Sequence, residues 1–287
     1  MFQHFRGPGG YPKTLFTKTT EHHQIVVTDD GEVRHLKFGD SLQSGMYVDD
    51  PVQSDFQYTE YFHLAWVFKQ DIRTVLFLGL GGGSAPKKFH ADYPELDIDI
   101  VEIDPEVVDV AQQYFHFRSG ARLHVTVDDA RTYLSNSDKR YDLIVHDAYY
   151  CETVPFHLIT REFFQMAVTR LTPTGVFVFN LISDVIGPDS MLFRGVYKCW
   201  QELFQTIYVF PVEQKRNIVL IGCLAGDAIS KDEVMLRAGR LETERGNVPR
   251  LQVHAQHLST GKVRTDDIPF IGDDLAGSQG GRSFMPV

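Results

Sequence analysis

Three acidic side chains stand at the ends of consecutive apolar runs. Glu102 ends the run DIDIVE, Asp129 closes RLHVTVDD, and Asp147 closes YDLIVHD. In a parallel sheet, ligands bind outside the carboxyl ends of the strands. A carboxylate at that edge can accept hydrogen bonds from hydroxyl or amino groups, or it can accept a proton during a reaction. The spacing therefore predicts a binding or catalytic site built from three strand ends.

A glycine cluster provides a fourth part of the same edge. Positions 79–83 read Gly-Leu-Gly-Gly-Gly, and they follow the apolar run TVLFL and precede a helical pattern. Glycine lets the backbone turn sharply and lets a ligand approach it, and the N-terminus of a helix offers unpaired N–H groups. We therefore expect Gly79, Gly81 and Gly83 to bind a nucleotide-type cofactor.

The spacing of the first acid suits a sugar contact. Glu102 lies 23 residues after Gly79, and an acid about 20 residues after such a glycine binds ribose hydroxyls in nucleotide-binding folds. Asp104 is a second candidate for this cofactor contact, although its place before Pro105 suits a helix cap better.

The remaining acids indicate which ligand is bound. A nicotinamide dinucleotide site needs glycine or alanine where this chain has Ser84, and it needs no acid after the third strand. An S-adenosyl ligand uses both acids, because Asp129 can accept a hydrogen bond from the adenine amino group and Asp147 would lie near the sulfonium. The sequence therefore favours an S-adenosyl ligand.

These side chains meet only if the chain forms a parallel sheet. From residue 73 onward, strand patterns alternate with helical patterns, which indicates right-handed βαβ crossovers. The predicted fold class is α/β, with a Rossmann-like, doubly wound, mostly parallel sheet. Upstream, two β-type runs flank Asp-Gly at positions 30–31, a pair typical of hairpin turns. This pattern predicts a small N-terminal antiparallel β module.

The expected domain organisation has four parts. They are an N-terminal arm over residues 1–20, the small β module over 21–55, the Rossmann-like domain over 56–230, and a C-terminal extension over 231–287 that we expect to be partly ordered. The boundary after residue 230 follows from the weakening of the alternating pattern.

Composition narrows the function classes. The chain has 287 residues, of which 43% are hydrophobic, and a net charge of −10, which argues against nucleic acid as a partner. Its three cysteines lack the CxxC spacing of a zinc site. No apolar run reaches the roughly 18 residues of a membrane span, and the N-terminus lacks a signal-peptide pattern. We expect a cytoplasmic protein with no metal and no membrane partner.

The sequence resembles the polyamine aminopropyltransferases, the spermidine synthase-like family, and most closely their bacterial branch that is often fused to membrane transporters. The resemblance runs from about His23 to Ser183. The segments that carry it are HQIVV, LKFGDSLQSGM, YTE, VLFLGLGGG, VEIDPEVV, DDARTYL, YDLIVHDAY and LTPTGVFVFN. It implies an N-terminal β module, a Rossmann-like transferase domain and a homodimer.

The resemblance implies a role for each part of the cofactor site. Gln43 matches the glutamine that contacts the nucleoside-sulfonium ligand, Glu102 the acid that binds ribose, and Asp129 the acid that binds adenine. The family's glycine motif continues into an Asp that binds the ammonium of decarboxylated S-adenosylmethionine, and this position is Gly82 here. The co-substrate is therefore expected to be decarboxylated S-adenosylmethionine or S-adenosylmethionine itself.

The resemblance also implies the reacting groups. Asp147 matches the catalytic base and Tyr58 its supporting tyrosine. The family's second, amine-binding Asp is replaced by Tyr150, and the His or Gln that follows the tyrosine is replaced by Thr59. We assign Tyr150 and Glu60 to the substrate amine.

The expected function is transfer of an aminopropyl group from decarboxylated S-adenosylmethionine to a small polyamine-type amine, with release of methylthioadenosine. Two alternatives remain open at the level of sequence. One is an S-adenosylmethionine-dependent methyltransferase, and the other is a nucleoside-binding homologue that has lost catalysis. Both are motivated by the replacements at Gly82 and Tyr150.

Overall fold

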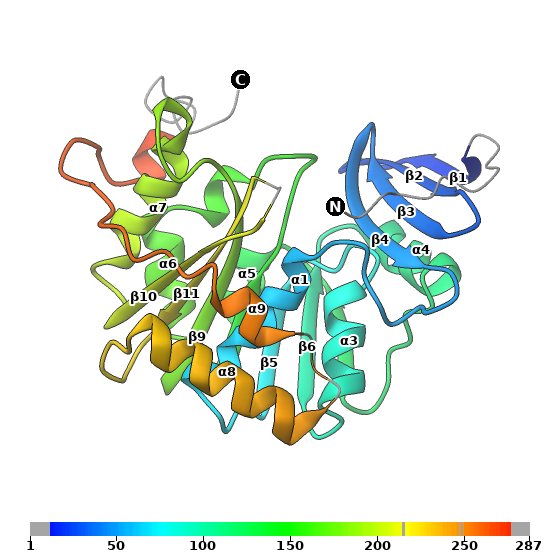
Figure 1. Ribbon diagram of the computed structural model, residues 1–287. Helices are drawn as coiled ribbons and strands as arrows, with labels where there is room; N and C mark the ends of the chain where they lie inside the picture. Colours follow the sequence, from blue (N-terminus) through cyan, green and yellow to red (C-terminus); the bar gives the residue numbers. More distant parts are fainter. Residues whose placement is uncertain (1–11, 214–215, 247, 249, 277–287) are drawn as a thin grey trace.

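The computed structural model describes residues 12–213, 216–246, 248 and 250–276 of the chain. This part contains a seven-stranded sheet covered by helices and a four-stranded sheet beside it (Figure 1). The predicted α/β class, with a mostly parallel Rossmann-like sheet and a small antiparallel N-terminal module, is confirmed.

The large sheet has the strand order β10-β11-β9-β8-β5-β6-β7. Neighbouring strands from β9 to β7 are parallel, whereas β11 and β10 run antiparallel to their neighbours. The strands are β5 (Thr74–Leu78), β6 (Asp97–Glu102), β7 (Leu123–Val127), β8 (Tyr141–His146), β9 (Leu171–Ile182), β10 (Thr206–Pro211) and β11 (Asn217–Cys223).

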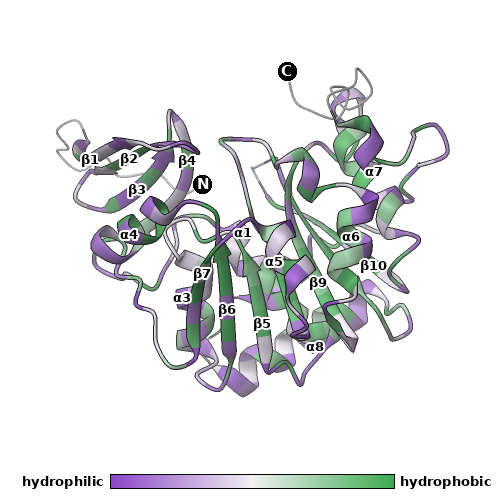
Figure 2. Ribbon diagram, turned by 180° about the vertical axis from the view of Figure 1, so that it is seen from behind, coloured by the Kyte–Doolittle hydropathy of each residue, from purple (hydrophilic) through white to green (hydrophobic). Residues whose placement is uncertain are grey.

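Both faces of this sheet are buried, which explains the continuous apolar runs in the sequence. In β5, Val75 and Phe77 point into one core layer, and Leu76 and Leu78 point into the other. Figure 2 shows the hydrophobic colouring along these central strands.

Helices form the two outer layers. The first layer contains α1 (Tyr58–Tyr61), α2 (Ala65–Phe68), α3 (Ser84–Asp92), α8 (Lys231–Arg245) and α9 (Leu251–Ala255). The second layer contains α5 (Ala130–Asn136), α6 (Arg161–Val168) and α7 (Met191–Trp200). Among the described residues, no helix is both long and apolar enough to cross a membrane.

The small sheet is an antiparallel meander of β1 (Lys13–Thr19), β2 (Gln24–Asp29), β3 (Val33–Phe38) and β4 (Ser41–Tyr47). The Asp-Gly turn lies between β2 and β3, where Gly31 has a φ of 93°. An L-residue with a side chain rarely adopts this conformation, so glycine suits the turn.

The prediction of a loose N-terminal arm over residues 1–20 is wrong for residues 13–19, which form β1. Residues 13–19 pair with β2 as the outer strand of the small sheet, and residues 1–11 lie outside the described part of the chain. A register shift between Thr14 and Phe16 breaks the simple alternation of side chains, so the strand pattern was not visible in the sequence. Leu15 and Phe16 pack against the core beneath the sheet.

A third core fixes the small sheet to the large domain. Helix α4 (Pro105–Tyr114) contributes Val107 and Val110, which pack with Ile25 and Leu36 of the small sheet. Thr20 also donates a hydrogen bond to Asp104, the N-cap residue of α4. The small sheet therefore covers the edge of the large sheet at which β6 ends.

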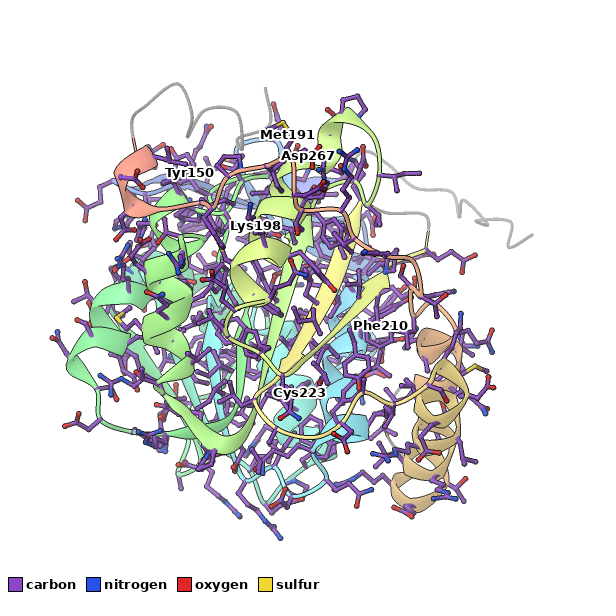
Figure 3. The ribbon with its side chains drawn as sticks, turned by 90° about the vertical axis from the view of Figure 1, so that its left-hand side faces the viewer. Tyr150, Met191, Lys198, Phe210, Cys223 and Asp267 are labelled. Atoms are coloured by element: carbon purple, nitrogen blue, oxygen red, sulfur yellow. The ribbon has the colours of Figure 1, made fainter. Side chains whose placement is uncertain are left out.

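The C-terminal extension packs on both helical layers. Helices α8 and α9 join the first layer, and Ile271 is buried in the second. The segment after α9 crosses α7, where the Lys198 ammonium donates to the Ile268 carbonyl oxygen and Arg194 pairs with Asp267. Figure 3 shows Lys198 and Asp267 on this side of the molecule.

Candidate functional site

A pocket lies at the carboxyl ends of β5, β6 and β8, between the large sheet and the small one. The turns after these strands form its floor, and β4 and α1 supply its other walls. The predicted site residues among its lining are Gln43, Tyr58, Gly79, Gly81, Glu102, Asp129, Asp147 and Tyr150. The structure therefore brings these side chains and backbone turns together in one place.

Asp147 is a half-buried acid in the pocket wall. Its Oδ1 accepts a hydrogen bond from Asn180 Nδ2 at 2.8 Å, and its Oδ2 accepts one from the Tyr58 hydroxyl at 3.2 Å. Burial raises the pKa of Asp147 from 3.8 to about 6, although both hydrogen bonds act in the opposite direction. A carboxylate with a pKa in this range suits a general base that works near neutral pH.

The groups behind Asp147 hold its partners in place. Asn180 directly follows Phe179 of β9, which pairs with His146 at the end of β8. Its Oδ1 accepts from Asn217 Nδ2 at 2.9 Å. The Tyr149 hydroxyl donates to the Asn180 carbonyl oxygen at 2.7 Å. The sequence analysis missed these three residues. The signal that could have revealed Asn180 is its polar amide at the end of the apolar run GVFVF.

Gly79 allows the two central strands to approach each other at the pocket floor. Its φ is 99°, and a Cβ atom there would lie 2.4 Å from the Asp147 carbonyl oxygen. A side chain at this position would therefore push Asp147 away from its partners.

Glu102 supports the glycine turn from the end of β6. Its Oε2 accepts from the Leu80 N–H and its Oε1 from the Asp104 N–H, both at 3.0 Å. Burial raises the pKa of Glu102 despite these bonds. Each carboxylate oxygen has a second lone pair, so Glu102 can still accept from ligand hydroxyls.

Asp104 acts as a helix cap. Its Oδ1 accepts from the Glu106 N–H at 2.9 Å at the start of α4, as expected from the position before Pro105. Asp104 is not part of the pocket lining, and neither is Gly83, which adopts a left-handed conformation as the N-cap of α3.

Asp129 is the N-cap residue of α5 and also lines the pocket. It accepts from the Thr132 N–H at 2.9 Å and from His157 Nε2 at 2.8 Å. The hydrogen bond from His157 is the main cause that lowers the pKa of Asp129 to about 2. His157 and the neighbouring Asp128 also line the pocket, and the sequence analysis did not single them out.

Gln43 and Tyr150 connect the small sheet with the turn after β8. Gln43 Nε2 donates to the Cys151 carbonyl oxygen at 2.9 Å. The ring of Tyr150 lies 5.5 Å from that of His23, which stacks on Phe38. Tyr150 is 55% exposed, so its ring borders the opening of the pocket.

Glu60, which the sequence analysis assigned to the substrate amine, lies outside the pocket lining. Its Oε2 pairs with His254 Nε2 of α9 at 2.7 Å, and its Oε1 accepts from Gln53. Glu60 is not among the lining residues, although the preceding turn of α1 places Tyr58 in the pocket. In this position Glu60 attaches α1 to the C-terminal extension.

One acidic cluster in the described part of the chain has the geometry for a metal ion. It consists of Asp97, Asp99 and His124, at the amino ends of β6 and β7 and so at the far edge of the sheet. The Lys139 ammonium already pairs with both aspartates at 2.8 Å. The cluster has no connection with the pocket.

The comparison with known families agrees with this geometry. Residues 55–209 match the family described as the spermine/spermidine synthase domain. The chain belongs to the spermine/spermidine synthase family. Membership of this family identifies the chain as a transferase enzyme.

The relatives of this chain include proteins named as aminopropyltransferases and proteins named as methyltransferases. A polyamine aminopropyltransferase from Vibrio vulnificus is 32% identical over 224 residues, which are 75% of this chain and 73% of the relative. The human eEF1A lysine and N-terminal methyltransferase is 32% identical over 158 residues, which are 51% of this chain and 22% of that protein.

Solved structures show the same fold. A probable spermidine synthase from Corynebacterium glutamicum has a TM-score of 0.69 at 21% identity, over 88% of this chain and 97% of that one. A spermidine synthase in complex with the transition-state analogue AdoDATO has a TM-score of 0.70 at 15% identity, over 86% and 85%. Human methyltransferase-like protein 13 in complex with SAH has a TM-score of 0.58 at 25% identity, over 74% and 97%.

The raised pKa of Asp147 predicts that its charge destabilises the fold. The folded protein binds a proton at Asp147 more tightly than the unfolded chain, so this group makes stability fall as pH rises from 3.8 toward 6. Asp147→Asn removes this penalty. Relative to wild type, the variant should gain about 2 kcal/mol of unfolding free energy between pH 4.5 and pH 8, measured by denaturant unfolding.

Asp142, at the other end of β8, provides the matched control. Burial raises its pKa, but hydrogen bonds from the Arg73 and Thr74 N–H groups and from Thr172, with the charge of Lys69, together outweigh burial and lower it. Asp142→Asn should therefore lose relative stability as pH rises. An Asp147→Asn variant that behaves like Asp142→Asn would show that the Asp147 charge stabilises the fold and that folding lowers its pKa instead of raising it.

Proposed function

We propose that this chain transfers the aminopropyl group of decarboxylated S-adenosylmethionine to an amine and releases methylthioadenosine. The observation that carries the proposal is the half-buried Asp147 carboxylate, held by Tyr58 and Asn180 in a pocket whose other acids suit a nucleoside. Family membership and the Vibrio relative support this reaction.

The proposed nucleoside contacts come from the first three strand ends. Glu102 would accept from the ribose hydroxyls, and Asp129 would accept from the adenine amino group. Gln43, fixed by its bond to the Cys151 carbonyl, would contact the ligand from the small sheet. These contacts leave Asp147 facing the sulfonium end, next to Tyr58.

The proposed transfer is a direct displacement. The amine nitrogen attacks the propyl carbon attached to the sulfonium sulfur, the new C–N bond forms as the C–S bond breaks, and the electron pair of that bond stays on sulfur. The nitrogen loses a proton to Asp147. Because the sulfonium is already a good leaving group, the protein has only to position the amine and accept its proton. The negative charge of Asp147 also attracts the incoming ammonium.

A second candidate is methyl transfer from S-adenosylmethionine to an amine. The specific observation in its favour is that the glycine turn has no acidic side chain at Gly82 to bind a lone ammonium. The human methyltransferase relative supports this candidate. The same base serves both reactions, which differ in the carbon that is attacked.

Asp147 should be required for transfer and dispensable for nucleoside binding. Asp147→Asn keeps the shape of the side chain but removes its charge and its capacity to accept the proton. General-base removal typically lowers the rate by about 10²–10⁴, so we expect a loss of this size in single-turnover transfer. Calorimetry should show methylthioadenosine affinity within about twofold of wild type. A variant that retains activity in proportion to folded protein would contradict the assignment.

Glu102 should control nucleoside affinity. Glu102→Gln removes a charged acceptor of the ribose hydroxyls, and a hydrogen bond to a charged group contributes about 1.5–3 kcal/mol. Methylthioadenosine binding should therefore weaken roughly ten- to a hundredfold. Asp104→Asn is the control, because Asp104 lies two residues away and caps α4 outside the pocket. Equal losses in both variants would point to a disturbed turn rather than a lost ligand contact.

A further inference from the structure

The N-terminus of α3 faces the pocket with unpaired donors. The helix runs from Ser84 to Asp92, and its N-cap, Gly83, has no side chain to cap the first turn. The first N–H groups of a helix have no partner within it, and Pro86 has no N–H at all. Ser84 and Ala85 therefore present their N–H groups at a helix end that attracts anions, and both residues line the pocket.

The Ser84 hydroxyl is a second, independent donor at this position. Ser84 is only 8% exposed, and its Oγ has no hydrogen-bond partner within the described part of the chain. A buried hydroxyl without a partner costs roughly 1–3 kcal/mol, so such groups are normally satisfied. In a pocket wall, this hydroxyl can donate to a ligand acceptor, and the neighbouring N–H groups favour an anionic one.

The charge around this helix end is also suited to an anion. Lys87, three residues after Ser84, is buried, and its ammonium donates to the carbonyl oxygens of Pro51 and Phe115. Carbonyl groups do not cancel the charge of the ammonium. Burial alone lowers the pKa of Lys87 to about 8, so it remains mostly protonated at neutral pH. The helix end and Lys87 both add positive potential on this side of the pocket, and Lys87 itself lies behind the lining.

The adjoining glycine turn cannot supply a compensating acid. A Cβ atom on Gly82 would lie 3.0 Å from the ring of Phe115 and 3.0 Å from Ser44 Cβ. The Gly82 N–H is already bonded to Ser44 Oγ at 2.8 Å. Neutral groups therefore close the Gly82 end of the turn, next to α3, whereas Glu102 bonds to its Leu80 end. The unsatisfied side-chain atom on α3 that lines the pocket in the described chain is the Ser84 hydroxyl.

We propose that the Ser84 hydroxyl and the N–H groups of Ser84 and Ala85 form a subsite for the carboxylate of an S-adenosyl amino acid. The pocket would then bind intact S-adenosylmethionine and S-adenosylhomocysteine in addition to the decarboxylated donor. The inference rests on the proposed nucleoside site, because that site must hold the adenosine while the carboxylate reaches α3. It does not depend on which group is transferred.

Two ligands that differ only in the carboxylate test this subsite. They are S-adenosylhomocysteine and S-adenosyl-3-thiopropylamine, its decarboxylated form, and calorimetry would compare them on wild type and Ser84→Ala. Wild type should bind the carboxylated ligand more tightly. Ser84→Ala should weaken that ligand roughly ten- to a hundredfold, the value of a hydrogen bond to a charged group, and should change the decarboxylated ligand less than about twofold.

Ser54→Ala is the matched control. Ser54 also lines the pocket, but its hydroxyl is already bonded to the Gly45 carbonyl and the Phe56 N–H. It should not distinguish the two ligands. Tighter binding of the decarboxylated ligand by wild type, or equal losses of both ligands in Ser84→Ala, would overturn the carboxylate subsite while leaving the nucleoside site intact. Failure of wild type to bind methylthioadenosine would overturn the nucleoside site itself, and the subsite with it.

Discussion

The site depends on holding one half-buried carboxylate charge at the pocket wall with few polar partners. Asp147 is surrounded by three elements that are distant in sequence: β5 accepts from its N–H, α1 supplies Tyr58 and β9 supplies Asn180. Burial raises the pKa of this group, and the two donors limit the rise. A fold that relaxed around Asp147 would hydrate it and return it to an ordinary surface acid. The close approach at Gly79 and the amide pair of Asn180 and Asn217 both prevent that relaxation.

The small N-terminal sheet completes the pocket rather than forming a separate unit. Its β4 strand supplies Gln43 and Ser44, which bond to the turn after β8 and to the glycine turn. Lys87 links α3 to the loop after β4 through the Pro51 carbonyl. These polar contacts and the shared core with α4 hold the sheet over the strand ends. In the reactions proposed above, this one scaffold would present the same Asp147 carboxylate to either carbon of the sulfonium donor.

The sequence was sufficient to predict the parts of the site that follow from strand ends. Glu102, Asp129 and Asp147 could be placed on one edge because a parallel sheet brings its carboxyl ends together, and the structure has all three in the pocket lining. Residues that act through tertiary contacts could not be placed this way. Asn180 belongs to an apolar strand, and only the pairing of β9 with β8 brings it to Asp147. Ser84 looked like a departure from a glycine motif, and its unsatisfied hydroxyl becomes visible only in the folded chain.

The most direct test of the account is the pH dependence of single-turnover transfer from decarboxylated S-adenosylmethionine to putrescine or spermidine. If Asp147 is the base, the rate constant should rise as pH passes about 6 and then level off, because the carboxylate form is the active one. In Asn180→Ala, which loses a hydrogen bond that lowers the pKa of Asp147, the same rise should shift to higher pH. A rate constant that is flat between pH 5 and 8, or no transfer at any pH, would contradict the account.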